Sequence, residues 1–171
     1  MSRLIIVSNR LPFSIDHEGD EVRLRQSSGG LVSAIKSYFE SNAALEEITD
    51  KLWFGVAHFP QEDWEQAISN HSVKYDFEIH PLFVDKQLYN DYYNGFSNSV
   101  LWPLFHYFPT LVQYPANFFE AYVQLNKKFC QELSSIIQPN DVIWIHDYQL
   151  MLLPQMLRRQ NPGATIGFFL H

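Results

Sequence analysis

Three short, continuous apolar runs constrain the fold of this 171-residue chain more than any other feature. They cover residues 4–7, 142–145 and 165–170, and they are rich in β-branched and aromatic side chains. Runs without polar alternation are typical of strands that are buried on both faces, as in parallel sheets. Stretches with helical spacing lie between the runs, the clearest at residues 118–137. We therefore predict an α/β fold in which helices cover both faces of a mostly parallel sheet.

Weaker patterns predict the remaining elements. Residues 13–15 and 22–25 alternate around a Glu-Gly-Asp turn, which indicates a surface hairpin. Residues 94–98 are too polar and irregular for a core helix. Further strands are expected at 52–56 and 73–79, and further helices at 31–39, 61–70, 86–93 and 150–159. The last apolar run ends directly before His171, where a sheet of this kind lacks its next helix, so we expect part of a larger protein.

Composition excludes several classes of protein. The net charge is −7, which is unfavourable for binding a nucleic-acid backbone. No apolar run approaches the ~18 residues of a membrane-spanning helix, and no signal peptide precedes the first strand. The one cysteine, Cys130, cannot form an intrachain disulfide and lies beside Phe129 on the long helix, so we interpret it as inert core. These features favour a cytoplasmic protein that binds neither membrane nor nucleic acid.

Polar clusters follow each of the three buried strands, where ligands bind in open α/β sheets. Ser8–Arg10 follows the first, and the Arg10 guanidinium suits a phosphate, although a surface arginine is the plain alternative. His146 and Asp147 follow the second and are adjacent, so they are poorly placed to chelate one metal. We expect one to be buried and hydrogen-bonded, and Asp147 to serve as a sugar-hydroxyl acceptor or base. His171 follows the third strand.

Two further groups suggest a binding site. Gly29 and Gly30 begin a predicted helix, where backbone N–H groups can approach an anion, although by itself the pair is better explained by a tight turn. Tyr92–Phe96 and Trp102 belong to a cluster of aromatic residues that suits a sugar, with plain core packing as the alternative. No spacing matches a zinc site, a P-loop or a nucleophile elbow, so no metal or cofactor is predicted.

Seven sequence blocks, in order along the whole chain, resemble those of trehalose-6-phosphate synthases. They are Ser8–Pro12, Ser28–Leu31, Trp53–Gly55, Tyr92–Asn98, Leu101–Tyr107, Trp144–Tyr148 and Gly167–His171. The resemblance implies a retaining glucosyltransferase that moves glucose from UDP-glucose to glucose 6-phosphate, giving α,α-trehalose 6-phosphate and UDP. It also implies the GT-B arrangement of two facing Rossmann-like domains. Residues 1–171 would then be most of the N-terminal, acceptor-binding domain, inactive alone, with most uridine contacts in the absent second domain.

The resemblance also implies roles for individual residues. On the acceptor side, Arg10 and Tyr93 would hold the phosphate, and Trp102 and Asp147 the sugar. On the donor side, the contacts would come from Gly29 and Gly30, at the diphosphate, and from His171, at the glucose. His171 and Asp147 are the candidate catalytic positions. In the implied front-side mechanism the departing phosphate takes the acceptor's proton, so neither a protein base nor a metal is required. Trp53 lies in one of the blocks, and the resemblance assigns it no role.

Two alternative functions stay open at the level of sequence. One is a related synthase with another phosphorylated acceptor, such as a glucosylglycerol-phosphate synthase, because Arg10 and Tyr93 suit any acceptor phosphate. The other is a non-catalytic regulatory subunit that senses a sugar phosphate. A downstream phosphatase domain and a homo-oligomer are both compatible with the sequence.

Overall fold

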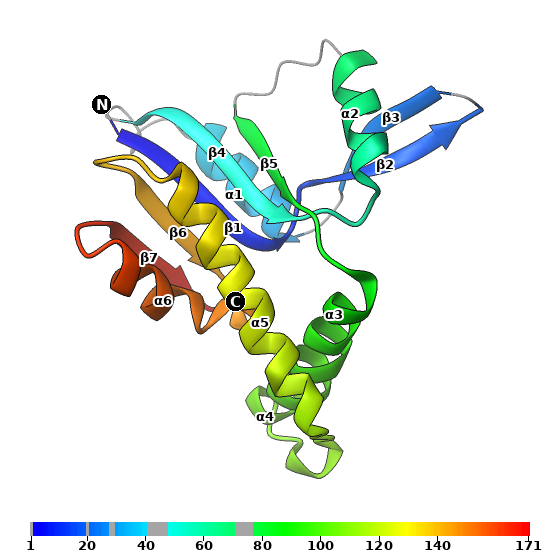
Figure 1. Cartoon of the computed structure of the whole chain (residues 1–171), viewed down its shortest axis with the longest axis vertical. Coiled ribbons are helices and arrows are strands. Elements are labelled where there is room, and N and C mark those ends of the chain that lie inside the picture. Colours follow the sequence, from blue (N-terminus) through cyan, green and yellow to red (C-terminus); the bar gives the residue numbers. More distant parts are fainter. Residues whose placement is uncertain (1, 20, 28–29, 41–47, 71–76) are drawn as a thin grey trace.

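A five-stranded parallel sheet forms the centre of the molecule, in the order β5-β4-β1-β6-β7 (Figure 1). The computed structural model describes residues 2–19, 21–27, 30–40, 48–70 and 77–171. The strands are β1 (Ser2–Arg10), β4 (Ile48–Val56), β5 (Glu78–Leu82), β6 (Val142–His146) and β7 (Thr165–Phe169). The prediction of a mostly parallel α/β fold is therefore confirmed, and β1 occupies the middle of the sheet.

Helices cover both faces of this sheet (Figure 1). Alternate residues of β1 belong to two different cores. On one side Ile5 and Val7 belong to the core formed with α5 (Ala116–Ile136) and α6 (Leu153–Gln160). On the other side Leu4 and Ile6 pack with Ile35 of α1 (Gly30–Glu40). All four β1 side chains are buried, as the unbroken apolar run predicts. In the part of the chain that the structure describes, no helix is long and apolar enough to cross a membrane.

The predicted hairpin forms a separate two-stranded antiparallel sheet. It consists of β2 (Phe13–Glu18) and β3 (Glu21–Gln26), and α2 (Gln61–Asn70) packs against it (Figure 1). His17 on β2 lies 3.2 Å from a carboxylate oxygen of Asp63 on α2. The hairpin and the helix at 61–70 are thus both where the sequence predicts them.

The segment expected to be irregular, residues 94–98, is helical. α3 (Lys86–Asn90) continues into a π-helix (Asp91–Leu101) and then α4 (Trp102–Phe105). Gly95, Phe96 and Ser97 are buried, because this helix packs against α5. Gly95 makes that contact close: a Cβ there would lie 2.7 Å from the Phe118 ring. The polar composition of the segment was therefore a misleading signal, since glycine and serine are the small residues that let two helices approach.

Two predicted strands also differ from the structure. The strand at 165–170 was expected to be buried, but most residues of β7 are exposed, because it is the edge strand of the described sheet and pairs only with β6. The strand expected at 73–79 is observed as β5, Glu78–Leu82. Residues 73–76 lie outside the described residues.

The long helix α5 packs against the sheet with the stripe that its sequence predicts. Tyr122, Leu125, Phe129 and Leu133 are buried at steps of three and four residues. Phe129 contacts Phe54 of β4 edge to face, with ring centroids 5.5 Å apart. Cys130, beside it, is buried, and burial raises the pKa of its thiol, which agrees with an inert core residue.

Phe129 therefore provides the first prediction. Phe129→Ala removes a fully buried ring between α5 and the central strands, and we expect it to lower the free energy of unfolding by about 3–5 kcal/mol. Phe108→Ala is the matched control, because that ring is half exposed, and its expected loss is below about 1 kcal/mol. Urea titrations of the two variants measure both values. Similar losses would contradict the assignment of Phe129 to the centre of the core.

Candidate functional site

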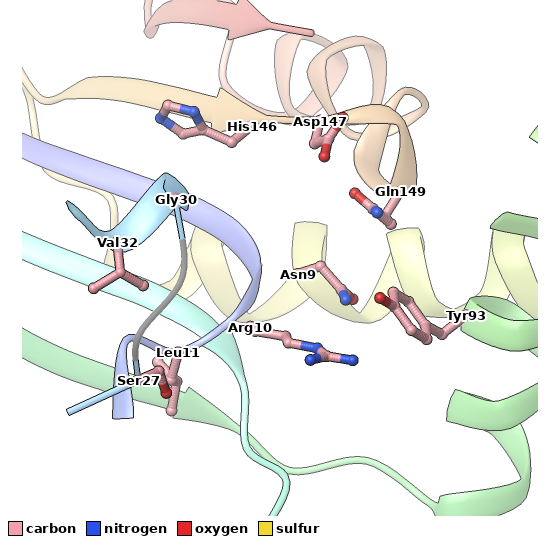
Figure 2. Close-up of a pocket in the computed structure, with 10 residues that line it drawn as sticks. All are labelled: Asn9, Arg10, Leu11, Ser27, Gly30, Val32, Tyr93, His146, Asp147 and Gln149. Carbon is pink, nitrogen blue, oxygen red and sulfur yellow. The ribbon is translucent and has the colours of Figure 1, made fainter. Parts of the chain in front are cut away.

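A pocket of about 340 Å³ lies beyond the carboxyl ends of β1 and β6. Its lining residues come from the end of β1, the start of α1, the π-helix and the segment after β6 (Figure 2). They are Asn9, Arg10, Leu11, Ser27, Gly30, Val32, Tyr93, His146, Asp147 and Gln149. Because β1 and β6 are parallel neighbours, the polar residues at their ends meet although the sequence separates them widely.

Arg10 is the last residue of β1, whereas the sequence predicted a loop there. Val7 pairs with Phe54 of β4 but Arg10 pairs with Val56, so β1 carries one extra residue in between. Such a bulge bends a strand and redirects its side chains. Here the bulge keeps Ser8 and Asn9 buried and leaves Arg10 exposed at the pocket.

Aromatic side chains surround Arg10. Its guanidinium carbon lies 5.0 Å from the centre of the Tyr93 ring, a cation–π distance, and Tyr93 stacks on Tyr89 with ring centroids 5.4 Å apart. Asn9 donates a hydrogen bond to the Tyr89 hydroxyl at 3.0 Å. Partial burial acts to lower the pKa of Arg10, but Tyr93 and Tyr89 outweigh it and the pKa stays above its usual value. The pocket therefore holds a permanent positive charge.

Asp147 has an unusual backbone conformation at the other side of the pocket. Its φ is 76° and its ψ is 166°, a region that is populated almost only by glycine. The conformation is held from both sides, since its N–H donates to the Phe169 carbonyl at 2.8 Å and its carboxylate accepts from the Tyr148 N–H at 2.9 Å. Strain of this kind is typical of functional positions.

His146 and Asp147 differ in burial as the sequence suggested. His146 is 1% exposed, and its Nδ1 lies 3.1 Å from Nε2 of His171. Burial lowers the pKa of His146 to about 4, and the nearby His171 adds to this effect. His146 is therefore neutral at pH 7, and one of the two imidazoles donates the hydrogen bond to the other. Among the described residues, which include His146 and His171, no three His, Cys, Asp or Glu side chains lie close enough together to hold a metal ion.

The structure brings together only part of the set of residues proposed from the sequence. Arg10, Gly30, Tyr93 and Asp147 share the pocket, and His171 reaches it only through His146. Trp102 does not line it: its side chain is 40% exposed and stacks on His106 at a centroid distance of 4.1 Å. Gly29 lies outside the described residues.

Some lining residues were not singled out from the sequence. Ser27 and Gln149 lie close to the predicted clusters, and only their positions at strand and helix ends could have indicated them. Two buried atoms at the pocket, Oδ1 of Asn9 and Nε2 of His146, have no hydrogen-bond partner in the described structure. Buried polar atoms without partners are uncommon, so both add a local cost to the folded structure beside the pocket.

Comparison with known proteins identifies the family. The family model described as glycosyltransferase family 20 matches residues 2–171. The chain belongs to glycosyltransferase family 20. This family 20 chain is 43% identical, over 99% of its length, to an alpha,alpha-trehalose-phosphate synthase [UDP-forming] A from Dictyostelium discoideum, of which it covers 22%. The resemblance read from the seven sequence blocks is thereby confirmed.

Solved structures give the same result for the fold. The family 20 chain superimposes on the structure described as "Trehalose-6-phosphate from E. coli bound with UDP-2-fluoro glucose". The TM-score is 0.73 and the sequence identity is 32%. The TM-score is 0.70, at 33% identity, for the UDP-forming alpha,alpha-trehalose-phosphate synthase from Burkholderia xenovorans in complex with glucose-6-phosphate. The chain is covered to 98–99%, but it spans only 33% of each of these two proteins.

The backbone of Asp147 provides the second prediction. Glycine adopts this conformation without strain, whereas alanine keeps the strain and also loses the carboxylate that accepts from the Tyr148 N–H. We expect Asp147→Gly to be more stable than Asp147→Ala by about 1 kcal/mol, after the larger unfolded-state entropy of glycine is subtracted. Thermal unfolding of both variants tests this difference. An alanine variant as stable as the glycine variant would show that the backbone is unstrained.

Proposed function

We propose that the protein carrying this chain transfers glucose from UDP-glucose to glucose 6-phosphate, giving α,α-trehalose 6-phosphate and UDP with retention at the anomeric carbon. The observation that carries the proposal is the pocket in which Arg10, Tyr93 and Asp147 meet at the ends of β1 and β6. Relatives named as UDP-forming trehalose-phosphate synthases, one of them in complex with glucose-6-phosphate, support it. Residues 1–171 would be the N-terminal, acceptor-binding domain of a two-domain GT-B enzyme.

On the acceptor side, Arg10 and Tyr93 bind the phosphate of glucose 6-phosphate in this proposal. The guanidinium offers two parallel N–H donors, and its contact with the Tyr93 ring limits its mobility. Asp147 accepts from sugar hydroxyls, and its carboxylate already lies at the pocket. Trp102, outside the pocket in this chain, would complete the sugar site only after movement of α4 or closure of a second domain.

On the donor side, the start of α1 approaches the diphosphate of UDP-glucose, with Gly29 and Gly30 providing backbone N–H groups. An α1 of 11 residues presents a positive dipole end there, which favours an anion. His171 contacts the donor glucose and is held by the neutral His146.

In the proposed reaction the residues of this chain bind and orient the substrates. The departing phosphate of UDP takes the proton of the attacking acceptor hydroxyl on the same face of the sugar. Asp147 and His171 hold the two sugars so that this transfer is geometrically accessible. The uridine contacts and the groups that stabilise the leaving diphosphate are assigned to sequence beyond residue 171. A cytoplasmic location is part of the proposal, supported by the single, buried cysteine.

Arg10→Ala in the full-length protein tests the acceptor assignment. A charge-assisted hydrogen bond contributes roughly 1.5–3 kcal/mol, so its loss should lower kcat/KM for glucose 6-phosphate about ten- to a hundredfold. Unphosphorylated glucose should lose far less, because it lacks the phosphate that Arg10 contacts. Arg10→Lys should recover only part of the activity, since a point charge lacks the planar fork of donors. Acceptor titrations at saturating UDP-glucose provide the numbers.

A melting curve for each Arg10 variant is the control for folding. The Arg10 side chain is exposed, and the pairing of β1 with β4 involves only its backbone. We therefore expect the Arg10 variants to keep this strand pairing and to fold. Equal losses with glucose and glucose 6-phosphate would contradict phosphate recognition by Arg10. Profiling other sugar phosphates and glycerol phosphate as acceptors in the same assay separates this synthase from one with a different acceptor.

Gly30→Val tests the donor assignment. A Cβ at Gly30 would meet nothing within 4 Å, so the chain itself tolerates a side chain there. A loss of UDP-glucose use then reports a clash with the ligand and not a fault in folding. We expect the KM for UDP-glucose to rise at least tenfold while the KM for glucose 6-phosphate changes little. Gly163→Val is the matched control, because that glycine also has open space but lies away from the pocket. An unchanged donor KM would support the tight-turn alternative.

A further inference from the structure

Trp53, whose role the sequence leaves open, is buried in the middle of β4 and makes a specific polar contact. Its side chain is 1% exposed, and its indole Nε1–H donates to the Ser8 hydroxyl at 2.8 Å. The bond is buried and joins residues 45 positions apart. A buried indole N–H needs an acceptor, and the acceptor here is the hydroxyl of a residue just before Arg10.

Ser8 in turn forms a hydrogen bond with the backbone of Arg10. The Ser8 hydroxyl, fully buried, lies 2.7 Å from the backbone carbonyl of Arg10. An indole can only donate and a carbonyl can only accept, so the direction of both bonds is fixed. Trp53 donates to Ser8, and Ser8 donates to Arg10. The hydroxyl therefore has a partner on both sides, and its rotation is restricted.

Gly55, two residues after Trp53, allows β4 to lie close to the same segment. A Cβ at Gly55 would lie 3.0 Å from both the Arg10 carbonyl carbon and the Ser8 carbonyl oxygen. This close approach coincides with the bulge, where the pairing shifts between Val7 and Arg10. The bulge is thus fixed by the backbone of β4 at Gly55 and by the Trp53–Ser8 hydrogen bonds.

We infer that Trp53 and Ser8 are positioning residues for acceptor recognition: together they fix the backbone of Arg10 and thereby aim its guanidinium. The inference rests on the proposed function, in which Arg10 binds the acceptor phosphate. The Arg10 side chain extends from the bulge toward the same part of the pocket as Tyr93 (Figure 2). A charged hydrogen-bonding group loses much of its effect when it is displaced by about 1 Å, so the fixed carbonyl matters for binding as well as for stability.

Trp53→Phe and Ser8→Ala in the full-length protein test the inference. Trp53→Phe keeps an aromatic ring but removes the donor, and Ser8→Ala removes both hydrogen bonds with the smallest change in shape. For each variant we expect the KM for glucose 6-phosphate to rise about three- to tenfold, as for one or two hydrogen bonds. The KM for UDP-glucose and the kcat should change less than twofold. Melting curves identify any variant that fails to fold.

Matched controls separate positioning from general loss of packing. Trp64→Phe changes a buried tryptophan on α2 that stacks on Phe59 and does not line the pocket. Ser97→Ala removes a fully buried hydroxyl that has no partner in the described structure. Both controls should leave the KM for glucose 6-phosphate within twofold of the unsubstituted protein. Controls that raise this KM as much as Trp53→Phe does would overturn the inference.

A double-mutant cycle gives the decisive result. If Trp53 acts through Arg10, then Trp53→Phe should cause no further rise in the KM for glucose 6-phosphate when Arg10→Ala is already present. Independent, multiplicative effects would overturn the positioning role. The proposed function would still stand in that case, provided that Arg10→Ala alone discriminates between glucose 6-phosphate and glucose. If Arg10→Ala does not discriminate, the acceptor assignment itself fails, and the two failures are therefore distinguishable.

Discussion

The pairing of β1 with parallel strands on both of its sides is the constraint on which the rest of the structure depends. Ile5, Ile6 and Val7 are completely buried between the two helical layers, so a one-residue slip in the register of β1 would move each of them into the opposite layer and disrupt its packing. That register fixes the position at which β1 ends relative to β6. It therefore brings Arg10 and Asp147, 137 positions apart, to one pocket.

Several polar groups at this end of the sheet carry a local energetic cost. Asp147 adopts a conformation that costs roughly 1–3 kcal/mol, and buried atoms of Asn9 and His146 lack partners in the described structure. The mainly apolar core beneath offsets these local costs, although it too contains buried polar atoms without partners, such as the Tyr92 hydroxyl.

The sequence predicted the sheet and the long helix well because their signals are local. The unbroken run at Leu4–Val7 and the stripe on α5 both follow from which faces are buried. The helical segment at 94–98 was missed, because its burial depends on a close contact between Gly95 and the distant Phe118. The bulge at Arg10 was missed for the same reason, since Gly55 and Trp53 on another strand create it. The resemblance to a known family located Arg10, Tyr93 and Asp147, but the relation between these residues required the three-dimensional pairing.

The electrostatics of the pocket explain how an acidic chain can serve an anionic substrate. The net charge of −7 is spread over the surface, where water and salt screen it. Arg10 instead lies against the ring of Tyr93, which stacks on Tyr89 and excludes water from one side of the guanidinium without neutralising it. One cation in such surroundings attracts a phosphate more strongly than distant carboxylates repel it. The other side of the guanidinium is open to solvent. The proposed transfer therefore requires a second domain that closes over the pocket and displaces water before the donor sugar reacts.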